Sequence, residues 1–61
     1  MRERLVVFFE ANPYTIQTAR QIARRLGEDE EEVRKELNCM ADDKCIQTID
    51  YPNVTIYRYI P

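Results

Sequence analysis

Hydrophobic residues near the start of the chain follow the period of a helix. Leu5, Phe8 and Phe9 have i, i+3, i+4 spacing, and Pro13 discourages continuation of a helix. The apolar run over residues 5–9 would also fit a buried strand, but its charged flanks and its length of about ten residues favour the helix. We therefore expect a helix over about residues 2–11.

A second helical pattern lies between Thr18 and Gly27. Thr18 and Gln21 have the spacing of a capping box, in which each side chain bonds the backbone amide of the other residue. The helix is expected over about residues 19–26, and Gly27 suits a left-handed helix end. Its inward-facing residues are Ala19, Ile22, Ala23 and Leu26.

A third helix is expected over about residues 30–42. Asp29 and Glu32 repeat the capping-box spacing, and consecutive glutamates fill the first turn, where the helix dipole favours negative charge. This chemistry explains the acidic run more simply than an acidic binding patch does. The inward-facing stripe consists of Val33, Leu37, Met40 and Ala41.

The hydrophobic period then changes from 3.6 to 2. β-Branched and aromatic residues alternate over about 46–50 and about 54–60, and the turn chemistry of Asp50–Asn53 joins the two segments into a hairpin. Another short strand is expected over about residues 15–17. The pattern predicts a single domain over residues 1–61, an α+β fold that is mainly α, with the element order α-β-α-α-β-β.

Composition limits what such a domain can do. The chain has 61 residues, of which 44% are hydrophobic and 33% charged, as in small globular domains. A core of this size leaves no room for a deep catalytic cleft. The chain has no histidine and one glycine, so it lacks the commonest general base and any glycine-rich phosphate loop. We expect no enzymatic activity, catalytic residue, metal or cofactor.

No apolar run in the sequence is long enough to span a bilayer, and no export signal is evident. We therefore expect a cytoplasmic protein without a membrane partner. Cys39 and Cys45 are six positions apart, which matches no common metal-ligand spacing. We interpret both cysteines as small hydrophobic residues.

The element order and the string of apolar positions resemble small bacterial and archaeal winged helix-turn-helix domains. The predicted hairpin falls where the wing of these domains falls, and Lys44 stands where the family usually has glycine. The resemblance covers essentially the whole chain and implies binding of double-stranded DNA in transcriptional regulation. The residues that carry it are Ile22-Ala23, Leu26-Gly27, Val33, Leu37, Met40 and Ile46.

In DNA-binding members of the family the third helix enters the major groove. The resemblance places Arg34 and Asn38 there, with side chains suited to guanine and adenine edges, and Lys35, which suits a phosphate. The start of the second helix would face the DNA backbone, and the hairpin would add further contacts. The residues implied at these two places are Thr18, Gln21 and Arg20, and Tyr51, Asn53 and Arg58.

The charge distribution supports an alternative function. The whole chain has a net charge of -2, and residues 28–43 hold eight acidic residues against two basic ones, which opposes contact with DNA phosphates. In this alternative, a winged helix binds a basic protein partner through its hairpin and through Glu31 and Glu32 of its acidic third helix. Val6 and Val7 widen the apolar face of the first helix, which would contact a protein partner, the same helix of a second copy in a homodimer, or the returning hairpin.

Overall fold

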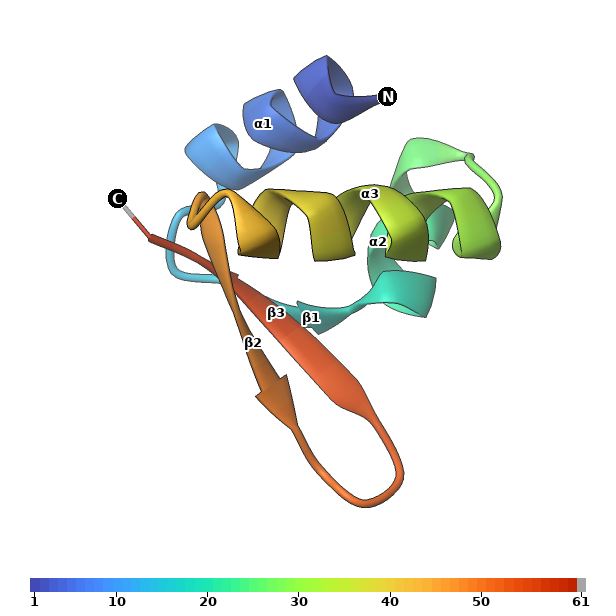
Figure 1. The fold of residues 1–61 in the computed structure, drawn as a ribbon. Coiled ribbons are helices and arrows are strands. Elements are labelled where there is room, and N and C mark those ends of the chain that lie inside the picture. The colour runs from blue at the N-terminus through green and yellow to red at the C-terminus, as the bar shows by residue number, and fades with distance from the viewer. Residues whose placement is uncertain (61) are drawn as a thin grey trace.

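The computed structural model describes residues 1–60 and combines three helices with a three-stranded antiparallel sheet (Figure 1). The predicted α+β class and element order are confirmed, and the three helices have the bounds that the sequence predicts. The helices pack on one face of the sheet, whose strand order is β1-β3-β2. The elements are α1 (Arg2–Ala11), β1 (Ile16–Thr18), α2 (Ala19–Leu26), α3 (Glu30–Asp42), β2 (Ile46–Asp50) and β3 (Thr55–Tyr59).

Two strands differ from the prediction at their ends. Thr15 donates its N–H to the carbonyl of Asn12 at 3.1 Å and so belongs to the turn before β1. Val54 accepts a hydrogen bond of 2.8 Å from the N–H of Tyr51 and closes the turn of the hairpin, while Ile60 follows the last paired residue of β3. The expected strands over 15–17 and 54–60 are corrected accordingly.

Local capping bonds define the turn between α2 and α3. The Oγ1 atom of Thr18 accepts the N–H of Gln21 at 3.2 Å, and the Oε1 atom of Gln21 accepts the N–H of Thr18 at 3.0 Å. Gly27 then ends α2 with a φ of 68°. At the start of α3, Asp29 accepts the N–H of Glu32 at 3.2 Å. The capping box of Thr18 and Gln21 is therefore complete. In the second capping pattern only the Asp29 side chain bonds a backbone amide, that of Glu32.

The core lies between the helices and the inner face of the sheet. Two hairpin tyrosines complete it: Tyr57 is 2% exposed, and the ring of Tyr59 stacks on Phe9 with a centroid separation of 6.0 Å. The largest fully buried side chains are Phe9, Leu5, Ile22, Leu37, Met40, Ile46 and Val33.

Ion pairs that no local pattern predicts attach α1 to the rest of the molecule. Arg2 contacts Glu36 at 2.8 Å and Asp43 at 2.7 Å, and these hydrogen bonds, that with Asp43 foremost, raise the pKa of its guanidinium. Arg4 pairs with Glu28 next to the turn between α2 and α3. Two positive charges from α1 therefore lie against acidic groups of the 28–43 segment.

Lys44 connects α3 to β2 in an unusual backbone conformation. Its φ is 63°, the only positive value found at a described non-glycine residue. Side chains with a Cβ pay a steric cost in this region, which glycine avoids. Lys44 therefore occupies a position where the backbone conformation favours glycine, the residue usual here in winged helix-turn-helix domains.

Cys39 and Cys45, which the sequence indicates only as small hydrophobic residues, are both exposed. Cys39 lies on α3 but outside the stripe formed by Val33, Leu37 and Met40, and Cys45 precedes β2. No helix within residues 1–60 has the length and apolar character required to cross a membrane.

Candidate nucleic-acid interface

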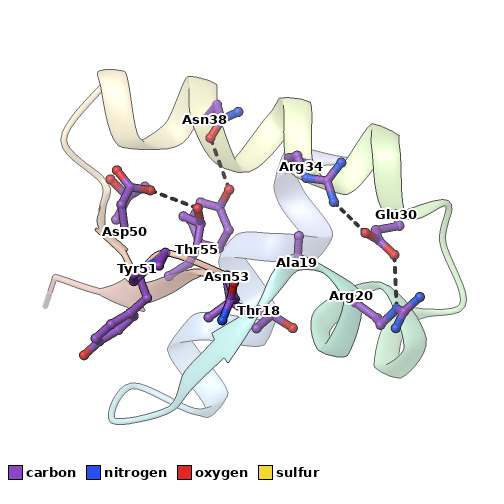
Figure 2. Close-up of a pocket in the computed structure, with 14 residues that line it drawn as sticks. Thr18, Ala19, Arg20, Glu30, Arg34, Asn38, Asp50, Tyr51, Asn53 and Thr55 are labelled. Atoms are coloured by element: carbon purple, nitrogen blue, oxygen red, sulfur yellow. Dashed lines mark hydrogen bonds and ion pairs between the residues drawn. The ribbon is translucent and has the colours of Figure 1, made fainter.

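An open groove of about 740 Å³ lies between the start of α2, one side of α3 and the β2–β3 hairpin (Figure 2). Each of these three parts contributes residues that the sequence analysis selected for DNA contact. The selected residues that line the groove are Thr18, Arg20, Arg34, Asn38, Tyr51 and Asn53.

Two arginines share one carboxylate on the helical wall of the groove. Glu30 accepts a bond of 2.5 Å from Nη2 of Arg34 and lies 3.5 Å from Nε of Arg20, as Figure 2 shows. Arg34 also donates to Glu31 at 2.5 Å. The hydrogen bond and charge of Glu31, followed by those of Glu30, raise the pKa of the Arg34 guanidinium. Arg34 is thus a permanent cation that acidic neighbours hold in place.

Asn38 is fixed from the sheet side. The hydroxyl of Tyr57 donates to Oδ1 of Asn38 at 3.2 Å, which joins β3 to the middle of α3 (Figure 2). Burial raises the pKa of the Tyr57 phenol, so the hydroxyl keeps its proton and remains a donor. The amide nitrogen of Asn38 retains its own two donor protons. Asn38 and Arg34 are one helical turn apart and face the same groove.

The hairpin forms the opposite wall and has a polar, uncharged tip. Asp50 accepts a bond of 2.9 Å from the hydroxyl of Thr55, which ties the two strands together just before the turn. Tyr51 is 56% exposed, and its ring points away from Arg34 and Asn38 in Figure 2.

Three of the selected residues lie outside the groove lining. Gln21 is exposed and uses its side chain in the cap of α2. Lys35 is exposed on α3 beside the groove. Arg58 alternates along β3 with the inward-facing Tyr57 and Tyr59, so it lies on the outer face of the sheet. It is therefore separated from Tyr51 and Asn53, which line the groove. The structure therefore brings together six of the nine proposed DNA contacts.

Several residues of the groove are not among the DNA contacts predicted from the sequence. Glu30 is four positions before Arg34, and this i, i+4 spacing is a signal that could have paired them. The period of two along the hairpin could have placed Thr48, Asp50 and Thr55 on the inner face with Tyr57. The charged residues of the lining are two arginines and two acids, so the groove is electrically balanced.

The residues of the protein-binding alternative are spread over two surfaces. Glu31 is paired with Arg34, whereas Glu32 is exposed at the start of α3. On α1, Val6 packs against the core, and Val7 is 64% exposed. Among residues 1–60, no set of three or more His, Cys, Asp or Glu side chains is arranged to bind a metal ion.

Comparison with protein-family models, with curated proteins and with solved structures gave no significant match for this chain. The chemistry of the groove therefore carries the functional argument. It combines guanidinium, side-chain amide and hydroxyl groups on an open surface, and these are groups that contact base edges and phosphates in protein–DNA complexes.

Proposed function

We propose that the chain is a winged helix-turn-helix module that binds double-stranded DNA and acts in transcriptional regulation. The observation that carries the proposal is the convergence of six selected residues from α2, α3 and the hairpin on one groove. The short turn between α2 and α3, and the return of the hairpin beside α3, support the winged-helix assignment.

In this proposal α3 enters the major groove of DNA. Arg34 and Asn38 are one turn apart and have the chemistry to contact guanine and adenine. Thr18 and Arg20 at the start of α2 would contact the DNA backbone. Arg34 has to exchange its bonds with Glu30 and Glu31 for bonds to the base, so binding includes a local rearrangement of ion pairs.

The acidic character of residues 28–43 is the main obstacle, and the fold reduces it. Arg2 and Arg4 of α1 lie against Glu28, Glu36 and Asp43 of that segment. Neutralisation of about three to five phosphates would give a slope of roughly -3 to -4.5 when log K is plotted against log salt. We expect weak binding by a single copy at physiological salt.

The same ion pairs favour a second candidate function. Arg34 is already held by two carboxylates, the hairpin tip is uncharged, and Glu32 is exposed at the start of α3. A basic protein partner could bind this acidic end of α3. In that case charge reversal at Glu31 and Glu32 abolishes binding to the basic partner, whereas loss of Arg34 has no effect on DNA affinity.

Fluorescence anisotropy with labelled duplexes of mixed sequence at low salt tests the proposal. We expect Arg34→Ala to weaken binding to preferred sequences about tenfold or more and to relax sequence preference, and Lys35→Ala to weaken all duplexes alike. Arg25→Ala is the matched control, because this exposed arginine lies over the ring of Phe8 and outside the groove lining. Equal affinity of all variants for every duplex would show that α3 does not read DNA.

A further inference from the structure

β2 forms a free edge of the sheet, because the strand order is β1-β3-β2. The bond from the N–H of Tyr51 to the carbonyl of Val54 fixes which residues of β2 bond to β3. Hydrogen-bonded pairs alternate in an antiparallel ladder, so Gln47 and Ile49 direct their backbone groups to β3. The residues that direct their N–H and C=O groups to the open side are Ile46, Thr48 and Asp50.

This edge has little protection against another strand. Natural sheets block free edges with lysine, proline, a bulge or a covering segment. From Ile46 to Ile49 the strand has neither a charge nor a proline, and it pairs with β3 without a bulge. Asp50 is the first charged residue along β2.

We propose that β2 pairs with β2 of a second copy of this chain, antiparallel and centred on Thr48. This register places Thr48 opposite Thr48 and Ile46 opposite Asp50, so all outward backbone groups of one strand meet those of the other. Each of the three opposing pairs exchanges two hydrogen bonds. The two sheets become one six-stranded sheet with a two-fold axis through Thr48.

The charges at the ends of β2 match this arrangement. Lys44 lies two positions before Ile46, which faces Asp50 of the other copy. Lys44 lies in the turn just before β2 and outside the ladder, but it is only two positions from Ile46, so its long side chain can extend toward that Asp50. Both residues are exposed, and the two-fold axis forms this attractive pair twice.

The shape of the surface also fits a second copy. A hollow of about 540 Å³ lies beside the beginning of β2, and Lys44, Gln47 and Arg58 are among its lining residues. In the proposed register Tyr51 lies diagonal to Gln47 of the other copy. Its ring is exposed and turned away from α3 (Figure 2), so it can enter the hollow of that copy.

The helices do not need to overlap in this dimer. Figure 1 shows that α1 and the C-terminal end of α3 lie at the beginning of β2, and that the hairpin tip extends beyond the three helices. Because the two copies of β2 run in opposite directions, α1 and the end of α3 in one copy lie at the opposite end of the joined strands from those of the other copy. The contact is small compared with the roughly 800 Å² per partner of a standard interface, so we expect a weak dimer.

Sedimentation equilibrium over a concentration series from micromolar to millimolar tests this inference on the whole chain. Thr48→Pro removes an outward N–H and places a ring at the edge, and it leaves the bonds to β3 intact. Thr48→Val is the matched control that keeps the N–H. We expect a monomer–dimer equilibrium for the natural chain and for Thr48→Val, and a monomer at all concentrations for Thr48→Pro, with circular dichroism to verify folding.

Charge exchange gives an independent test. Lys44→Asp or Asp50→Lys alone should raise the dimer dissociation constant about tenfold, and the double variant should restore it. A natural chain that remains monomeric at millimolar concentration overturns the proposal. A dimer that survives both Thr48→Pro and the single charge reversals also overturns it, and loss of that dimer in Val7→Asp would assign the interface to α1.

Discussion

Replacement of Glu30 by glutamine should strengthen DNA binding. Glu30 bridges Arg34 at 2.5 Å and Arg20 at 3.5 Å on the wall of the groove. For DNA to engage these arginines it must compete with this carboxylate. Glutamine has the same shape and can still accept a hydrogen bond, so the substitution removes the charge and little else.

The size of the effect follows from the exposure of the three side chains. Between 37% and 71% of each is accessible to solvent, so water weakens both ion pairs. An exposed pair of this kind is worth about a factor of two in an equilibrium constant, and two pairs give about fourfold. Removal of a negative charge that faces phosphates adds about another factor of two at low salt. We therefore expect Glu30→Gln to bind duplex DNA about fourfold to eightfold more tightly than the natural chain.

The assay is a fluorescence anisotropy titration of one labelled duplex at several salt concentrations. Glu32→Gln is the control, because it removes the same charge from the same helix at an exposed residue outside the groove lining. It should change affinity by about twofold or less. The advantage of Glu30→Gln should shrink as salt rises. Equal affinities for Glu30→Gln, Glu32→Gln and the natural chain would refute the idea that Glu30 restrains DNA-binding arginines.

Two further predictions concern the scaffold of the groove. Lys44→Gly relieves a left-handed backbone conformation that costs a non-glycine residue about 1–2 kcal/mol. Glycine also gives the unfolded chain more conformational entropy, which lowers the stability of the folded state by about 0.5–1 kcal/mol. We expect a net stabilisation of about 0.5–1 kcal/mol and a rise in Tm of about 2–8 °C by calorimetry at micromolar concentration, and no gain for Lys44→Ala. Tyr57 has a raised pKa in the folded state because it is buried. Its contribution to stability is complete below the usual tyrosine pKa of about 10 and is lost as the pH rises through the folded-state pKa. Urea titrations at pH 9 and pH 11 should therefore show a smaller alkaline loss for Tyr57→Phe than for the natural chain; an equal loss would contradict this assignment.

Helix boundaries were predictable from the sequence because their causes are local. The capping box of Thr18 and Gln21 and the left-handed Gly27 act within a few residues, so spacing alone locates both ends of α2. The exposure of Cys39 could also have been predicted from a local pattern, the helical spacing of apolar residues along α3. It falls outside the inward stripe of α3, and that position decides its burial more than its residue type does.

The composition of the groove was only partly predictable, because it depends on contacts between distant segments. Asn38 meets Tyr57 across 19 positions of sequence, and Arg2 meets Glu36 across 34. No spacing rule anticipates such pairs. Arg58 could have been placed correctly, since strand alternation puts it on the face opposite Tyr57. The charge summed over residues 28–43 omits a long-range contribution of the same kind, because Arg2 and Arg4 of α1 pair with three of its acidic residues.

The most direct test of DNA binding is an amide-shift titration of the chain with mixed-sequence duplex DNA, at low salt and again at physiological salt. The proposed function predicts salt-sensitive shifts that cluster at residues 18–21 and at Arg34, Lys35 and Asn38. Resonances on the outer face of the sheet, such as that of Arg58, should remain unchanged. An absence of shifts at low salt, or shifts confined to that outer face, would contradict DNA binding through the groove.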